Sequence, residues 1–301
     1  MTFRSVFVLV LALWPAVACV APPAWAAPAR SIEAVASFTV LADMVHQVGG
    51  DRVHVTSLVG PNGDPHAFEP SPDDARKLKA ADIVFINGLG LEGWMTRLIT
   101  ASGFKGKQVV ATAGIRTIRL VENGKQVLDP HAWNSAANGV IYVQNIVKVL
   151  VAADPEAADF YRANGERYAG ELRQLDADAR QRIAAISPGR RKVLTSHDAF
   201  GYFAADYGVT FLSPVGLSTE GEASARSVAA LIRQIKAEKV RTYFLESSND
   251  PRLVQQVANA TGAQLGGTLY VEALSPPGGP APTYAALLRN NIDVMVAAMN
   301  Q

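Results

Sequence analysis

The segment from Asp154 to Ile186 constrains the fold more than any other part of the chain. Its apolar residues recur at helical spacing throughout, and Pro155 stands at the position expected for the first residue of a helix. Pro188 and Gly189 follow it and would stop a helix there. We therefore predict one helix over 154–186, capped by Asp154. It is either an ordinary long core helix or a stiff connector that spans two lobes and joins them once, and we favour the connector.

On both sides of this segment, short β-rich runs alternate with amphipathic helical stretches, a pattern typical of α/β units with parallel strands. Strands are expected at 35–40, 53–59, 82–87, 108–112, 192–196, 209–215, 241–247 and 263–270. Helices are expected at 42–49, 72–80, 91–101, 199–207, 224–238, 251–260 and 282–299, with a hairpin over 118–128 that turns at Asn123-Gly124.

The predicted fold class is α/β, with two similar lobes, each a mostly parallel sheet flanked by helices, joined by one long connector helix. The predicted divisions are a signal peptide at 1–26, an N-terminal metal-binding lobe at 27–153, the connector helix at 154–188 and a C-terminal metal-binding lobe at 189–301.

The N-terminus reads as a secretory signal. Arg4 precedes an apolar run that is too short to span a membrane comfortably, and Ala24-Trp25-Ala26 has the pattern of a signal-peptidase site. We predict export, with cleavage near Ala26, over a retained anchor helix. A lipid anchor on Cys19 is the other alternative, disfavoured because the residues before it lack the usual leucine three positions upstream.

Composition excludes several classes of function. Cys19 is the one cysteine of the sequence, so the mature chain would have no disulfide and no thiolate metal site. A formal net charge of +1 without a basic run argues against nucleic acid as a partner. An apolar content of 49% indicates a globular chain. Any bound metal would have to use His, Asp, Glu or backbone oxygen.

Three histidines occur in similar local sequences. His66 lies in "GDPHAF", His131 in "LDPHAW" and His197 in the looser echo "SHDAF". His66 and His197 follow predicted strands of opposite lobes, where open parallel sheets place their ligand groups. We therefore predict that the three imidazoles bind one metal ion. His46, within a helix, and His54, within a strand, have no such context and are interpreted as ordinary histidines.

The residues around these histidines have physical uses. Proline before His66 and His131 stiffens the backbone, and the preceding aspartates can accept a hydrogen bond from each ring and set its tautomer. Phe68 and Trp133 could form a dry wall beside the metal.

Three neutral imidazoles leave one corner of a tetrahedron open. Glu272, just past the last predicted strand, is the candidate fourth ligand, and Glu246 and Asp250 are its rivals.

The chain resembles the periplasmic zinc- and manganese-binding receptors of metal ABC importers. The likeness covers nearly all of the mature chain, and it is carried by "GPNGDPHAFEPSPDDARKLKAADIVFINGLGLEGW", "DPHAWNS", "YRANGERYAGELRQLD", "TSHDAFGYFAADYG", "FLESSNDPR" and "LSPPGGPAPTYAALLRNN". The resemblance implies two α/β lobes with a single metal between them, bound by His66 and His131 from the first lobe and by His197 and Glu272 from the second. It also implies a periplasmic monomer that partners an inner-membrane ABC permease. The chain departs from the family in having Glu272 where Asp is common, and in lacking a His-rich loop before Asp129.

The expected function is therefore capture of a divalent transition metal and its delivery to the importer, without enzymatic activity. Three nitrogens and a carboxylate favour Zn²⁺, with Mn²⁺ as the alternative. A secreted zinc hydrolase is the rival from another class, although the sequence has no HExxH motif, and a surface adhesin has no independent support. We expect metal release to begin at the loop that follows Glu272, which is rich in proline and glycine.

Overall fold

The structure is a computed structural model that describes residues 31–122, 125–221 and 223–301. The predicted signal peptide at 1–26, with Cys19 and the Ala26 cleavage site, lies outside the described residues, as does the predicted Asn123-Gly124 turn.

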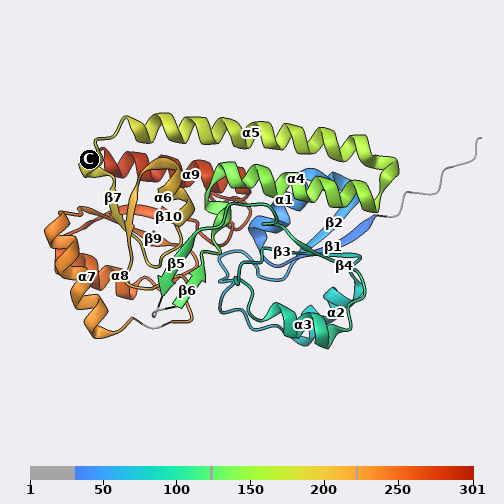
Figure 1. Cartoon of the computed structure of the whole chain (residues 1–301), viewed down its shortest axis with the longest axis horizontal. Helices are drawn as coiled ribbons and strands as arrows, with labels where there is room; N and C mark the ends of the chain where they lie inside the picture. The colour runs from blue at the N-terminus through green and yellow to red at the C-terminus, as the bar shows by residue number, and fades with distance from the viewer. Residues whose placement is uncertain (1–30, 123–124, 222) are drawn as a thin grey trace, which may run out of the picture. The chain divides into compact units, whose positions relative to one another are not determined.

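The first lobe is built on a four-stranded parallel sheet in the order β2-β1-β3-β4 (Figure 1). Its strands are β1 (Ile32–Ala36), β2 (Val53–Ser57), β3 (Ile83–Ile86) and β4 (Lys107–Val110). Its helices are α1 (Thr39–Gly49), α2 (Pro72–Ala80), α3 (Met95–Ser102) and α4 (Ala136–Ala153). A two-stranded antiparallel hairpin, β5 (Arg119–Glu122) and β6 (Lys125–Leu128), follows the sheet and confirms the predicted hairpin.

The second lobe repeats this arrangement. Its parallel sheet has the order β10-β9-β7-β8 and, read from β8, the same order of strands in sequence as the first sheet. Its strands are β7 (Lys192–Leu194), β8 (Thr210–Leu212), β9 (Thr242–Glu246) and β10 (Gln264–Leu269). Its helices are α6 (Gly201–Tyr207), α7 (Ala225–Glu238), α8 (Arg252–Thr261) and α9 (Tyr284–Met299). The chain thus has the predicted class, two α/β lobes with mostly parallel sheets.

Local sequence explains some element boundaries directly. Helix α2 occupies the predicted range because Ser71 and Asp74 form a reciprocal capping box and Pro72 starts the helix. The strand predicted at 35–40 is misplaced, since β1 ends at Ala36 and α1 begins at Thr39. Residues 40, 41, 44, 45 and 48 are all buried, and this helical spacing overrides the β-rich composition of the segment.

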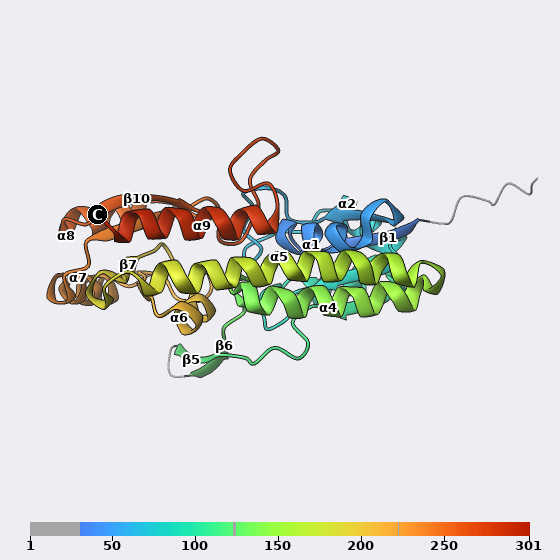
Figure 2. The ribbon, with the colours of Figure 1, turned by 90° about the horizontal axis from the view of Figure 1, so that it is seen from above.

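Helix α5 (Ala158–Ala184) runs along both lobes (Figures 1 and 2). Tyr168 and Leu172 pack into the core of the first lobe, and Ala179 and Ile183 pack into a core of the second. The same helix therefore contributes to two hydrophobic cores, as a connector requires.

The start of this helix differs from the prediction. Pro155–Ala157 forms a 3₁₀ turn, and Asp154 makes no side-chain cap hydrogen bond. Its carboxylate accepts hydrogen bonds from Arg52 Nη1 at 3.2 Å and from the Tyr161 hydroxyl at 2.9 Å. The prediction of an Asp154 cap was wrong because these partners engage the carboxylate instead.

The chain also returns to the first lobe near its end. Leu274, Tyr284 and Leu288 belong to the core of the first lobe, although the sequence assigns them to the C-terminal lobe. Leu274 N–H donates to Thr39 Oγ1 at 2.9 Å, and Tyr284 N–H donates to Asp43 Oδ2 at 2.8 Å. The segment that follows β10 is consequently tied to the first lobe at both ends.

Candidate metal centre

The four predicted site residues lie in loops at the ends of secondary-structure elements. His66 lies between β2 and α2, and His131 precedes a 3₁₀ turn (Ala132–Asn134) that leads into α4. His197 follows β7, and Glu272 follows β10. Three of the four therefore come from loops beyond strand carboxyl ends, where parallel sheets present ligand groups.

The structure brings these side chains together around one carboxylate oxygen. Glu272 Oε1 lies 2.9 Å from His66 Nε2, 3.1 Å from His197 Nε2 and 3.6 Å from His131 Nε2. The Nε2 atoms of His66 and His131 are 3.1 Å apart. One candidate ligand atom from each of the four residues lies within 4.8 Å of the others.

This cluster is buried. His66 is 7% exposed, His197 1%, and His131 and Glu272 are fully buried. Burying an ionised carboxylate is costly unless it is paired with positive charge. The cluster is therefore suited to hold either a cation or the protons that replace one.

Two further carboxylates orient the imidazoles. Asp129 Oδ1 lies 2.8 Å from Nδ1 of His131, and Glu246 Oε2 lies 2.5 Å from Nδ1 of His197. A carboxylate behind Nδ1 fixes the ring and directs Nε2 inward, as metal-ligating histidines usually require. The sequence anticipated this role for Asp129. Glu246 was considered only as a rival ligand.

The remaining expectations about carboxylates fare differently. Asp64 Oδ1 accepts the backbone N–H of His66 at 2.8 Å, so this aspartate holds the backbone of its histidine, whereas Asp129 also holds the ring of His131. Asp250 lies on the surface, paired with Arg252 at 2.8 Å, and this guanidinium lowers the pKa of Asp250 to about 2. Asp250 therefore lies outside the cluster of four, and Glu246 contacts the Nδ1 side of His197.

Aromatic residues hold the site loops in place. Trp133 is fully buried, with its ring centroid 5.4 Å from that of His131, and its Nε1–H donates to Val271 O at 2.6 Å. The Tyr284 hydroxyl donates to Trp133 O at 2.6 Å. These bonds link the Glu272 loop to the His131 loop. The sequence suggested Trp133 as a wall but gave no signal for Tyr284, whose partner is a backbone oxygen far away in sequence.

Phe68, the other residue of the expected wall, is half-buried. Its ring packs edge-on against Trp94 at 4.8 Å, and Trp94 Nε1–H donates to Pro65 O at 2.8 Å. Phe68 and Trp94 together therefore support the His66 loop.

Burial and charge oppose one another in this cluster. Burial disfavours protonation of His131, but hydrogen bonds to Asp129 and Glu272 outweigh it and raise the pKa of His131. Burial is likewise outweighed at His197, where the charges of Glu246 and Glu272 raise the pKa well above 6.5. Burial would raise the pKa of Glu272, but the His197 charge and the imidazole hydrogen bonds hold it well below 4.5. A metal ion that bound to this cluster would have to replace protons on His131 and His197.

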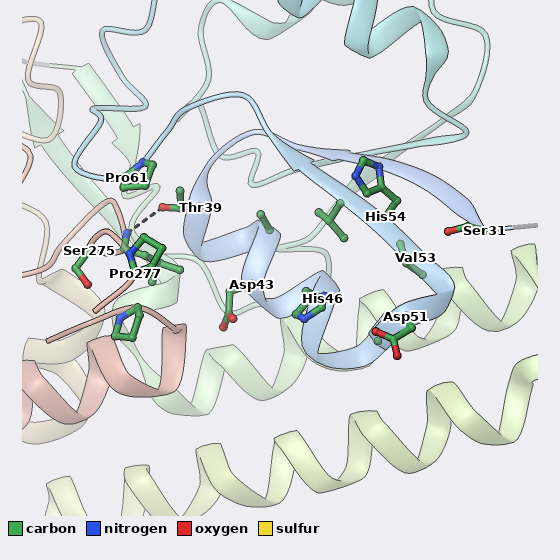
Figure 3. A pocket seen from close by; sticks show the side chains of 15 residues that line it. Ser31, Thr39, Asp43, His46, Asp51, Val53, His54, Pro61, Ser275 and Pro277 are labelled. Carbon is green, nitrogen blue, oxygen red and sulfur yellow. Dashed lines mark hydrogen bonds between the residues drawn. The ribbon is translucent and has the colours of Figure 1, made fainter. Parts of the chain in front are cut away.

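The two other histidines lie elsewhere. His46 and His54 are both exposed, and His54 Nδ1 pairs with Glu33 at 2.8 Å. Both line a separate cavity of about 770 Å³ between α1, β2 and the segment around Ser275 (Figure 3). Neither belongs to the four-residue ligand cluster found among the described residues.

Residues 34–298 match the family described as ZnuA, zinc-uptake complex component A, periplasmic. The iron ABC transporter substrate-binding lipoprotein MtsA of Streptococcus pyogenes serotype M1 is 34% identical over 300 residues, which cover 97% of this chain and 94% of MtsA.

Solved structures show the same likeness. A Mn-bound periplasmic metal-binding protein from Candidatus Liberibacter asiaticus has a TM-score of 0.81 at 34% identity, covering 89% of this chain and 100% of that one. The periplasmic zinc-binding protein TroA of Treponema pallidum has a TM-score of 0.85 at 29% identity, covering 89% and 99%. With two α/β lobes and a match over most of its length, this chain belongs to the ZnuA family of periplasmic metal-binding receptors of ABC importers.

Proposed function

We propose that this receptor captures Zn²⁺ through His66, His131, His197 and Glu272 and delivers it to an inner-membrane ABC permease. The observation that carries the proposal is the single oxygen of Glu272 facing the Nε2 atoms of three imidazoles in a buried cluster. Three nitrogens and one carboxylate are the donor set of a closed tetrahedral zinc site.

The choice of metal rests on this donor set and not on the relatives. MtsA is named for iron, the Liberibacter protein is Mn-bound and TroA is named for zinc, so family membership is compatible with each. Mn²⁺ prefers more oxygen ligands than this cluster provides. Glu272 could supply a second oxygen, Oε2, which lies 3.4 Å from Ser248 Oγ, and this keeps a manganese receptor as the second candidate.

A zinc hydrolase is less well supported. A hydrolase needs an open coordination position and a nearby base. Here Glu272 lies among the imidazoles, where its carboxylate would fill the fourth position of a metal bound by them, and the family consists of substrate-binding transport proteins. Turnover of ester or peptide substrates by the zinc-loaded protein would revive this alternative.

The experiment is a titration of the metal-stripped mature chain with Zn²⁺, Mn²⁺ and Fe²⁺ by calorimetry, with chelator competition for tight binding. We expect one tight zinc site and weaker binding of the other two ions. Glu272→Ala should weaken zinc binding strongly, whereas Asp250→Ala, the exposed rival, should bind as wild type. Tighter manganese than zinc binding, or an unaffected Glu272→Ala, would overturn the zinc assignment or the ligand assignment respectively.

We also propose that the mature receptor is a periplasmic monomer that starts near Ala27. MtsA is named a lipoprotein, which makes an anchor on Cys19 the alternative. Mass spectrometry of the exported protein separates the two, because cleavage at Ala26 removes Cys19 and lipidation retains it. Light scattering of the purified chain tests the monomer.

A further inference from the structure

Two cavities reach the ligand cluster, and they differ in chemistry. The polar cavity, about 680 Å³, has one wall of polar and charged residues beside His197, namely Asp64, Ser196, Ser248, Asn249 and the Asp250–Arg252 pair. Val215, Leu253 and Val254 also line it. The apolar cavity, about 500 Å³, is lined by His66 together with Leu89, Leu91, Val127, Leu128 and Leu217. Each cavity therefore touches a different candidate ligand.

One segment, residues 215–221, lies between the cavities, and we call it the strap. Thr219 and Gly221 line the polar cavity, whereas Leu217, Ser218 and Glu220 line the apolar cavity. The strap thus presents a different set of residues to each side.

The strap is fastened at two places beside the ligands. Val215 forms a parallel bridge with His197, and Asp198 N–H donates to Gly216 O at 3.2 Å. Farther along, Thr219 Oγ1–H donates to Asp64 Oδ2 at 2.6 Å. The Thr219–Asp64 bond joins the second lobe to the loop that carries His66. The other oxygen of Asp64 accepts the backbone N–H of His66, so the bond ends directly beside this candidate ligand.

A divalent cation that sheds its water needs polar groups to replace it, since transfer of an ion to apolar surroundings is very costly. In the polar cavity, polar side chains extend to two candidate ligands, Glu272 and His197. Ser248 Oγ lies 3.4 Å from Glu272 Oε2, and Asn249 Nδ2 lies 2.9 Å from His197 Nδ1. The positive charge of Arg252 is paired with Asp250 and opposes entry little. The apolar cavity offers leucine and valine side chains around His66, with Glu220 as the charged side chain that lines it.

We infer that the metal ion enters and leaves through the polar cavity, and that the Thr219–Asp64 hydrogen bond is the latch that closes this route. The inference rests on the proposed metal-binding function. It places the moving part at the strap and not at the loop after Glu272, whose two ends are hydrogen-bonded to the first lobe. Neither Thr219 nor Asp64 is a candidate ligand, so the latch can open without moving the loops that carry the four candidate ligands.

A matched pair of glycine substitutions tests the route. Gly221 lines the polar cavity and Gly93 the apolar cavity. A Cβ on Gly93 would meet nothing within 4 Å, and a Cβ on Gly221 would meet only Ser218 O at an ordinary 3.5 Å. We expect Gly221→Phe to slow zinc association and dissociation together, measured by stopped-flow competition with a fluorescent zinc indicator, and Gly93→Phe to leave both rates unchanged. Slowing by Gly93→Phe, alone or equally with Gly221→Phe, overturns the inference.

Substitution of the latch gives an independent readout. Thr219→Val keeps the shape of the side chain and removes the hydroxyl, so both rates should rise by roughly three- to tenfold, the factor that one hydrogen bond supplies, with little change in Kd. Thr210→Val, the same substitution at an exposed threonine of β8 that lines neither cavity, is the matched control and should exchange zinc at wild-type rates. Unchanged rates in Thr219→Val overturn the latch. If wild type itself binds no zinc, the proposed function fails instead, so the two failures are distinguishable.

Discussion

Gly201 of the second lobe packs directly against the Asp129 carboxylate of the first lobe. A Cβ atom at Gly201 would lie 2.3 Å from Asp129 Oδ2, and Oδ1 of the same carboxylate accepts both the backbone N–H and the ring Nδ1–H of His131. Asp129 is fully buried, so it has little room to yield. A residue of one lobe thus sets the position of a candidate metal ligand in the other.

Gly201→Ala should therefore weaken zinc binding without touching a ligand. The added methyl group must displace the Asp129 carboxylate, and loss of such an outer partner typically costs about 10- to 100-fold in metal affinity. Chelator competition measures the change. Gly170→Ala is the control, because a Cβ there, in the middle of α5, meets nothing within 4 Å. Wild-type affinity in Gly201→Ala would show that the two lobes do not position Asp129 in this way.

Glu246→Gln should also reduce zinc affinity, by about 10- to 100-fold for loss of a carboxylate behind a ligating histidine. Glu246 Oε1 accepts the backbone N–H groups of Ser196 and His197, and Oε2 lies behind the ring of His197. An amide keeps the size of the side chain but removes the charge that favours the inward-facing Nε2 ligand. Binding should fall less than in Glu272→Ala, and an equal or larger loss would indicate that Glu246 itself is a ligand.

The stability of the metal-free protein should depend on pH in a defined direction. Raised pKa values of His131 and His197 stabilise the folded metal-free state fully below about 6.5, the unfolded value, and this contribution is lost as pH rises through the folded values. The lowered pKa of Glu272 adds stability to the folded state above about pH 4.5, and this stability is lost as pH falls through the folded pKa. Between pH 7 and 9 the Tm of the metal-free chain should therefore decline.

Zinc binding should reverse this dependence, because histidines that ligate a metal must be deprotonated. The rise in Tm on zinc saturation should grow as pH increases, and calorimetry in buffers of different ionisation enthalpy should show protons released on binding. A metal-free Tm that increases steadily from pH 7 to 9, together with no proton release, would contradict the protonated cluster. The groups that set these shifts are Asp129, Glu246 and Glu272.

The positions of the three histidines were predictable because their signal is local. His66 and His131 each follow Asp-Pro, and parallel α/β topology brings loops at strand ends together. The fourth residue was not decided by the same logic, since Glu246 and Glu272 both stand at the ends of strands in one sheet. Only packing separates them, with Glu246 behind His197 and Glu272 in front of it.

The wrong Asp154 cap also has its origin in tertiary contacts. Asp154 has a good capping sequence, but Arg52 and Tyr161 engage its carboxylate. The Arg52–Asp154 contact joins residues far apart in the sequence, and such a contact leaves no local periodicity or motif to read. The expectation that metal release begins at the loop after Glu272 stays a prediction, set against the burial of Leu274 and Ser275 and the hydrogen bonds that join the ends of the loop to the first lobe.

Tyr284→Phe tests how far this anchoring supports the site. The hydroxyl of Tyr284 donates to Trp133 O at 2.6 Å in a fully buried position, so its removal leaves a buried carbonyl without that donor, at a cost of about 1–3 kcal/mol in the free energy of unfolding. Because Trp133 in turn donates to Val271 O beside Glu272, zinc affinity should fall as well. Urea denaturation of the metal-free chain gives the first quantity and chelator competition the second. Tyr270→Phe, at a half-buried tyrosine on the same segment, is the matched control and should change both quantities little. A Tyr284→Phe variant that loses stability but binds zinc as wild type would mean that the first lobe anchors this segment without positioning Glu272.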